Sequence, residues 1–224
     1  MAEPAPLAPR MRARDPHEPH RAATPLELLY DLCFVVAIAQ AAAALHHAIA
    51  HGHALHGAIG FGVVFFAIWW AWMGFCWFAS AFDCDDASYR IKVLVQMVGV
   101  LVLAAGVSRA AEQFDAGRLV AGFVVMRIGL AAQWLRAGRS VPTYRRTAHR
   151  YVAGMIVLQA AWIASLWLPA DRWLWAFAGL AAFELLVPAW AERARATPWH
   201  RHHIAERYGL LTIIVLGESV LAAT

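Results

Sequence analysis

The amino-acid sequence predicts an all-α, polytopic membrane protein: a bundle of about seven membrane-spanning helices with a cytoplasmic N-terminus. Three observations predict this class. Of the 224 residues, 61% are hydrophobic and only 15% are charged, with a mean hydropathy of +0.52, whereas soluble domains are typically ~45–50% apolar and ~25% charged. The apolar residues gather in seven runs, most of them near the ~20 residues that cross a bilayer. Basic residues alternate between the connections of these runs.

This composition argues against a soluble enzyme and against a disordered chain, because a soluble core of this size cannot bury so much apolar surface. A formal net charge of +4 is compatible with nucleic-acid binding, but the positions of the basic residues favour a different partner. Nearly all basic residues lie in or beside the connections, and Arg127 alone lies deep inside an apolar run. That distribution is typical of loops at an anionic membrane surface, so we expect the lipid bilayer, and no nucleic acid, as a partner.

Residues 1–23 are rich in Pro, Arg and Ala and contain no apolar segment of a signal peptide, so we expect a disordered cytoplasmic tail. Residues 24–224 form the predicted transmembrane domain. Its runs must be helical, because hydrocarbon leaves no other partner for the backbone polar groups. The predicted spans are residues 25–48, 56–81, 91–110, 118–135, 151–168, 172–191 and 205–224.

The first span has a clear start. Thr24-Pro25-Leu26-Glu27 has the pattern of a capping box, in which the Thr24 hydroxyl accepts from the backbone of Glu27 and the Glu27 carboxylate accepts from the backbone of Thr24. Pro25 suits the first helical position, where its missing N–H costs nothing.

The distribution of basic residues predicts the orientation. The tail and every second connection carry 15 Lys and Arg residues, and the other connections carry three. The positive-inside rule places the richer side in the cytoplasm, so we expect a multi-pass membrane protein with its N-terminus in the cytoplasm.

Three segments together carry a family resemblance: TPLELLYDLCFVVAIAQ (24–40), FDCDD with YRIKVLVQMVGVLVLAAGV (82–107), and HIAERYGLLTIIVLGESVLA (203–222). They resemble the bacterial low temperature requirement A (LtrA) family of polytopic membrane proteins. The family's acidic loop usually has Thr at the position of Cys84. The resemblance implies an integral, multi-pass protein of the bacterial cytoplasmic (inner) membrane, without an established substrate. Family members are usually longer, and the last run ends without an interfacial flank, so we expect a C-terminally truncated member.

Four ionisable residues are predicted inside the hydrocarbon region, where each one costs at least ~2.5–3.5 kcal/mol to insert. Arg127 and Glu218 fall near the midplane, and Asp31 and Glu184 about 10 Å from the cytoplasmic ends of their runs at 1.5 Å per residue. We interpret the four as one polar layer that handles a proton or a cation, with Arg127 opposite Glu184 or Glu218. The alternative is an ion pair that only holds helices together.

A second constellation is predicted at the cytoplasmic mouth. Glu27 shares a helix face with Asp31, and His203 shares one with Glu206, which precedes Arg207. These residues either cap and pair at the interface, or form a gate in which Glu27 pairs with Arg207.

The short loop after the second run carries Asp83, Asp85 and Asp86. Three carboxylates this close suit a hard divalent cation such as Mg²⁺. The alternative is that Asp85 or Asp86 caps the next helix.

Other residues indicate how the helices pack against one another and against lipid. The second run is crowded with aromatic residues, which we interpret as lipid contact and bulk packing, with a cation–π pocket as the alternative. Gly99 and Gly179 are expected at close helix contacts. Pro188 is expected to kink its helix one turn after Glu184.

The preferred function is therefore a transporter- or channel-like membrane protein whose polar layer handles a proton, a cation or a small solute. The first alternative is an intramembrane enzyme that acts on a lipid or envelope precursor, with a divalent metal at the Asp83–Asp86 loop. The second is a membrane scaffold without turnover. The sequence contains no GxSxG, HExxH, P-loop or GxGxxG motif, and a homo-oligomer is compatible with all three functions.

Overall fold

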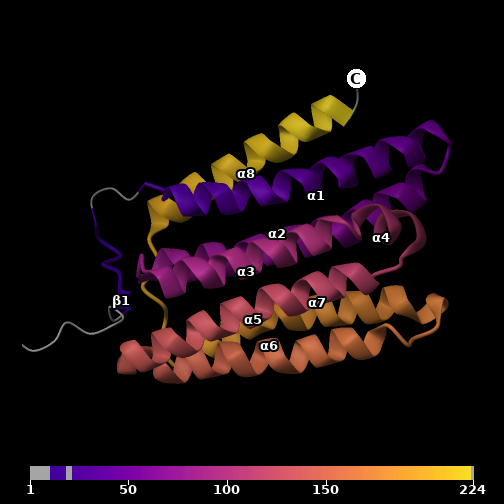
Figure 1. Cartoon of the computed structure of the whole chain (residues 1–224). Coiled ribbons are helices and arrows are strands. Elements are labelled where there is room, and N and C mark those ends of the chain that lie inside the picture. The colour runs from indigo at the N-terminus through magenta and orange to yellow at the C-terminus, as the bar shows by residue number, and fades with distance from the viewer. Residues whose placement is uncertain (1–10, 19–21, 223–224) are drawn as a thin grey trace, which may run out of the picture.

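The long helices lie side by side along one common direction and form a single bundle (Figure 1). The computed structural model describes residues 11–18 and 22–222. The all-α class predicted from the sequence is confirmed. The elements are β1 (Arg12–Ala13), α1 (Pro25–Ala50), α2 (Ala54–Ala81), β2 (Phe82–Asp83), α3 (Ala87–Ala104), α4 (Val107–Gln113), α5 (Gly117–Ser140), the 3₁₀ turn η1 (Pro142–Tyr144), α6 (Arg145–Ser165), α7 (Ala170–Glu192) and α8 (Arg201–Ala222).

Five segments of the described chain are long and apolar enough to cross a membrane. They are Pro25–Ala50, Ala54–Ala81, Ala87–Gln113, Gly117–Ser140 and Asp171–Glu192. The other two predicted spans are also helical, as α6 and α8, but α6 begins with a run of arginines and α8 carries Glu206, Arg207 and Glu218. The count of seven spans and the cytoplasmic N-terminus remain predictions.

Local sequence sets the helix ends as expected at two places. At the start of α1, the Thr24 side chain accepts from the backbone of Glu27 and the Glu27 carboxylate accepts from that of Thr24, so the capping box is confirmed. At the start of α3, Asp86 accepts from the backbone N–H of Tyr89 at 2.7 Å. The third predicted span is interrupted, since the chain turns at Ala105–Gly106 between α3 and α4.

The N-terminal segment differs from the disordered tail that we expected. Residues 11–18 are ordered: β1 pairs antiparallel with β2, which follows α2 directly, and the Met11 side chain is buried in the core. The His200 ring also contacts the carbonyl oxygen of Glu18 at 2.8 Å. Backbone pairing and one apolar anchor therefore fix this part of the tail, while residues 1–10 and 19–21 lie outside the described residues.

Helices α3 and α5 pack with their backbones in close contact. A Cβ atom on Gly99 would lie 2.8 Å from the carbonyl oxygen of Gly122, and one on Gly122 would lie 2.6 Å from that of Gly99. Small residues permit such approach between helices in lipid. The expectation for Gly99 is thus confirmed, whereas that for Gly179 is wrong, because a Cβ there meets no atom within 4 Å.

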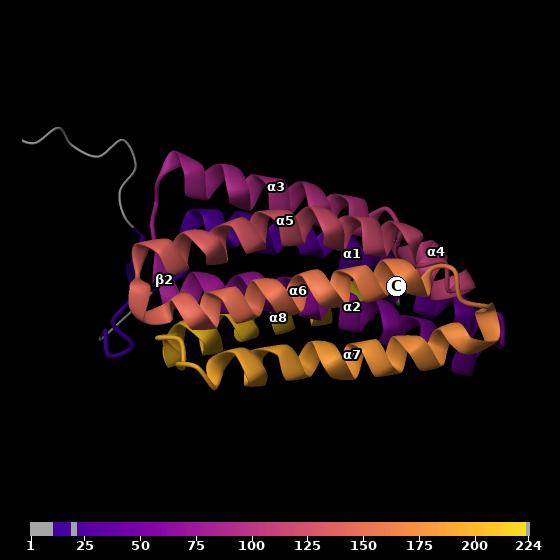
Figure 2. The same ribbon diagram turned by 90° about the horizontal axis from the view of Figure 1, so that it is seen from below.

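Helix α7 lies along one edge of the bundle beside α6 (Figure 2), and its main packing partner is α6. Many of its apolar side chains are exposed, including Phe183, Leu186 and Trp190. Large buried aromatic side chains gather instead around α2, where Phe75 packs against Tyr30 and Phe78 packs against Trp134.

We predict that Gly122→Leu destabilises the protein by about 1–3 kcal/mol, because the side chain must push α3 away from α5. Thermal unfolding of purified protein in a neutral detergent measures this. Gly179→Leu is the matched control and should leave the unfolding temperature nearly unchanged. Equal effects of the two substitutions would contradict the close α3–α5 contact.

Candidate functional site

The centre of the candidate site is an ion pair between α5 and α7. An Arg127 guanidinium nitrogen donates to Oε1 of Glu184, and both side chains are buried, with 9% and 3% exposed. Arg127 also donates to the carbonyl oxygen of Met155 on α6 at 3.4 Å and lies over the Phe123 ring, 5.3 Å from its centroid. The pairing of Arg127 with Glu184, one of the two partners expected from the sequence, is thus present.

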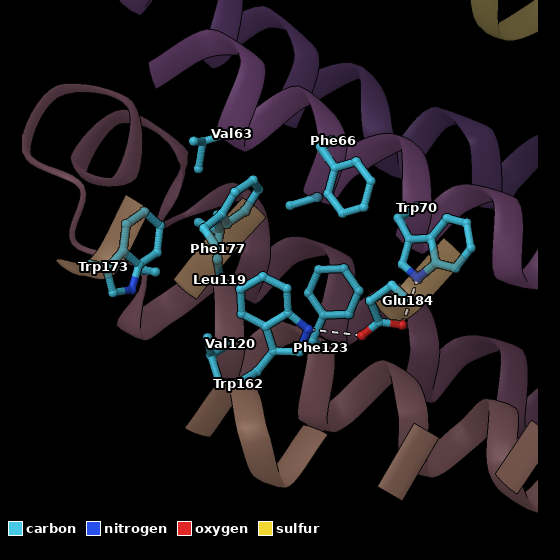
Figure 3. A pocket seen from close by; sticks show the side chains of 12 residues that line it. Val63, Phe66, Trp70, Leu119, Val120, Phe123, Trp162, Trp173, Phe177 and Glu184 are labelled. Atoms are coloured by element: carbon cyan, nitrogen blue, oxygen red, sulfur yellow. Dashed lines mark hydrogen bonds between the residues drawn. The ribbon is translucent and has the colours of Figure 1, made fainter. Parts of the chain in front are cut away.

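Two indole groups complete the shell of Glu184 (Figure 3). Trp162 on α6 donates to Oε1 at 2.8 Å, and Trp70 on α2 donates to Oε2 at 2.9 Å. Four helices therefore meet at one carboxylate. The sequence reasoning missed both tryptophans, although an indole N–H inside hydrocarbon needs an acceptor and thereby points to a buried carboxylate or carbonyl.

Cavities adjoin this shell on both sides. The larger, of about 380 Å³, extends toward the ends of α5 and α7 and is lined by Arg127, Glu184 and the rings of Trp70, Trp134 and Tyr151. The smaller, of about 30 Å³, lies toward the opposite end of the bundle and is almost entirely aromatic and aliphatic (Figure 3). Trp70, Phe123 and Glu184 line both, so Glu184 lies between the two cavities, whereas Arg127 lines only the larger one.

The larger cavity carries further polar groups at its end near the basic connections. Oε1 of Glu192 accepts from the Tyr151 hydroxyl at 3.1 Å and from Thr197 at 2.6 Å. Pro188 also lines this cavity within α7. Because proline has no N–H, the carbonyl oxygen of Glu184 lacks its usual helical donor, which leaves an additional acceptor on the same residue that forms the ion pair.

A second buried group, the Arg207 cluster, consists of Glu27, Asp31, His203 and Arg207. Arg207 donates to Oδ1 of Asp31 at 2.7 Å and lies 3.5 Å from Oε2 of Glu27, which contacts the His203 ring at 3.0 Å. All four side chains are at most 4% exposed. Trp72 on α2 donates to Asp31 at 2.7 Å, and Cys76 accepts from Arg207 at 3.2 Å. The cluster joins α1, α2 and α8.

The structure thus divides the predicted polar layer. Arg127 and Glu184 pair as expected, but Asp31 lies in the Arg207 cluster because α8 packs against α1. Glu218 has no ion-pair partner in the described part of the chain, and its side chain is only partly buried. Of the predicted mouth residues, Glu27, His203 and Arg207 come together, whereas Glu206 is exposed.

The acidic loop is held by arginines. Asp85 forms a two-pronged hydrogen bond with Arg90 at 2.7 and 2.8 Å, which lowers the pKa of its carboxyl. Asp86 accepts hydrogen bonds from the Arg136 guanidinium, at 2.9 Å, and from the backbone N–H of Tyr89. These donors hold the pKa of the Asp86 carboxyl well below its usual value. The helix cap is therefore present. In the described residues no group of three potential ligands gathers for a metal, and the side chain of Asp83 lies outside the described atoms, so the proposed Mg²⁺ site gains no support.

These features define the class: a multi-pass, all-α membrane protein whose buried carboxylates are matched by arginines and indoles. Residues 22–224 match the family described as bacterial low temperature requirement A protein, and the chain belongs to that family. It is 28% identical over 204 residues to an uncharacterized protein of Rhizobium meliloti (strain 1021), covering 87% of this chain and 49% of the relative. The chain thus spans about half the length of that curated relative. No solved structure matches significantly.

We predict that Arg207→Met destabilises the fold by about 3–5 kcal/mol, because it leaves buried carboxylates without their cation. The double variant Arg207→Met/Asp31→Asn should recover part of this loss, as one carboxylate charge is removed as well. Thermal unfolding in neutral detergent measures both, with the exposed Arg201→Met as control. A double variant no more stable than Arg207→Met would contradict the charge-matching role.

We also predict that Asp86→Asn lowers stability by about 1–2 kcal/mol at pH 7, because the ion pair with Arg136 and the negative charge at the start of α3 are lost. Because folding lowers the pKa of Asp86, its contribution is complete above the unfolded value of ~3.9 and is lost as the pH falls further. The difference between the two proteins should therefore hold from pH 7 to pH 5 and shrink below about pH 4. The exposed Asp171→Asn should change stability by less than about 0.5 kcal/mol.

Proposed function

We propose that this chain forms the solute-handling part of a transporter- or channel-like protein of the bacterial cytoplasmic membrane. The route runs between α2, α5, α6 and α7, and the Arg127–Glu184 pair closes it. The observation that carries this proposal is the position of Glu184, held by Arg127, between two cavities that share Trp70, Phe123 and Glu184 as walls.

The dimensions favour a small solute over a bare proton. A volume of about 380 Å³ falls in the range of small-molecule sites, which are mostly apolar with a few convergent polar groups. Arg127, Glu184 and Glu192 are such groups, surrounded by aromatic rings. A relay for protons or metal cations would instead favour a continuous row of polar side chains, and the smaller cavity is lined by apolar residues apart from Glu184 and the Trp indole groups.

The pair is suited to act as a gate because it joins a loosely packed helix to the rest of the bundle. Glu184 is held by groups from α2, α5 and α6, while the backbone of α7 packs mainly on α6. A solute with its own charged or hydrogen-bonding group can replace Glu184 as the partner of Arg127. Such an exchange supplies the differential contacts that a shift between two states requires.

Two alternative functions compete with this proposal. In a scaffold, the same pair only ties helices together and never opens. In an intramembrane enzyme, the Asp83–Asp86 loop would hold a divalent metal, but Asp85 and Asp86 are already bound to Arg90 and Arg136. We therefore retain the scaffold as the competitor that an experiment must exclude.

Cysteine accessibility tests the route without knowledge of the solute. Ala67 lines the smaller cavity and Ala71 the larger one, and they lie one turn apart on the same face of α2. We predict that Ala71→Cys reacts with a membrane-impermeant methanethiosulfonate reagent added to inside-out vesicles, whereas Ala67→Cys does not. Adding Glu184→Gln should raise the rate at Ala67→Cys about tenfold or more, because the closed state loses its ion pair.

The unsubstituted chain, with Cys33, Cys76 and Cys84, supplies the background rate. Thermal unfolding of each variant shows that the protein remains folded. If Ala67→Cys stays unreactive in a folded Glu184→Gln protein, the pair is a structural tie and the scaffold is correct.

A further inference from the structure

A groove outside the proposed route concentrates basic side chains at one end of the bundle. It lies between the start of α6 and the end of α7, with a volume of about 510 Å³. Arg145, Arg146, His149 and Arg150 line it together with the Trp190 ring. Among the residues that line this groove, none is acidic.

The basic side chains of this groove differ from the two arginines that hold the acidic loop. Arg90 and Arg136 are bound to carboxylates of the acidic loop. Arg145 and Arg146 are exposed, and neither forms an ion pair with any described residue. The groove therefore presents positive charge that no acidic side chain of the described protein balances.

Specific contacts between α6 and α7 form the floor of the groove. Arg150 donates to the carbonyl oxygen of Trp190 at 3.0 Å, and its guanidinium lies 5.4 Å from the centroid of the Trp190 ring. On the next turn, Gly154 lets α6 approach α7 so closely that a Cβ there would lie 2.7 Å from Val187. These contacts hold the two helices together and fix Arg150 beside a tryptophan, a residue typical of the membrane interface.

An apolar track continues from the basic groove along the bundle. Arg146, Arg150, Ala153 and Val157 share one face of α6 by their spacing of three and four residues, and Val157 is 66% exposed. On α7, Trp190 shares a face with Leu186 and Phe183, which are 57% and 60% exposed. The positively charged groove thus continues into an exposed apolar surface of the kind that acyl chains cover.

We propose that this groove binds one anionic phospholipid, with the phosphate against Arg145, Arg146 and Arg150 and the acyl chains along the exposed faces of α6 and α7. Charge complementarity selects an anionic headgroup, since basic pockets between membrane helices bind such lipids. The apolar track selects a lipid over a free phosphate ester. This site is independent of the Arg127–Glu184 route.

The test uses the purified chain in a neutral detergent and follows lipid binding by native mass spectrometry. Dioleoyl phosphatidylglycerol should bind in preference to dioleoyl phosphatidylcholine. Arg145→Gln/Arg146→Gln should weaken phosphatidylglycerol binding about tenfold or more, as two charges at a membrane surface are lost. Arg139→Gln removes an exposed arginine at the same end of the bundle but outside the groove, and should change binding less than about twofold.

Two further experiments distinguish binding at this groove from general electrostatic attraction of anionic lipid. Ala153→Trp fills the groove without changing any charge and should also abolish the preference for phosphatidylglycerol. Glycerophosphoglycerol, the headgroup without acyl chains, and inorganic phosphate should compete only weakly. The proposal is overturned if Ala153→Trp binds phosphatidylglycerol as the parent does, if both lipids bind equally, or if either soluble anion competes as well as the lipid. Thermal unfolding confirms that each variant is folded.

Discussion

The whole arrangement depends on one constraint: a carboxylate inside the bundle must be met by donors from neighbouring helices, because hydrocarbon supplies none. Helix α2 satisfies this constraint on two sides. Trp70 donates to Glu184 of α7 and Trp72 donates to Asp31 of α1. Two residues apart on a helix means about 200° of rotation, so the two indoles leave α2 in nearly opposite directions. Helix α2 is therefore the shared wall between the Arg127–Glu184 pair and the Arg207 cluster.

Features that depend on local chemistry could be predicted from the sequence. The helices follow from the apolar runs, and both caps follow from short-range patterns at Thr24 and Asp86. The pairing of Arg127 with Glu184 was within reach for a similar reason. The rise per residue fixes the depth of a side chain along its helix, which leaves Glu184 and Glu218 as the partners expected for Arg127 without choosing between them.

Neighbour relations between helices could not be derived in this way. Depth says nothing about which helix stands beside which, so Asp31 was grouped with Arg127 although its cation, Arg207, comes from α8. The same limit applies to the glycines. Gly99 and Gly179 look alike in sequence, yet Gly99 meets the backbone of α5 and Gly179 faces open space. The order in Met11–Glu18 was missed because it depends on the free edge of β2, a tertiary feature.

The two buried groups differ in what surrounds them, and this difference supports the separate roles that we propose for them. Arg207 is entirely buried and bound to α1 and α2, which suits a fixed joint of the bundle. Glu184, in contrast, lines two cavities and belongs to a helix packed mainly on α6. Its bonds to Arg127 and Trp70 add polar ties from α7 to α5 and α2, beside the apolar contacts that Trp173 and Phe177 make with the same helices. If those bonds are exchanged for a solute, the α6–α7 pair is the part free to shift, while the Arg207 cluster keeps α1, α2 and α8 in place as the frame against which it moves.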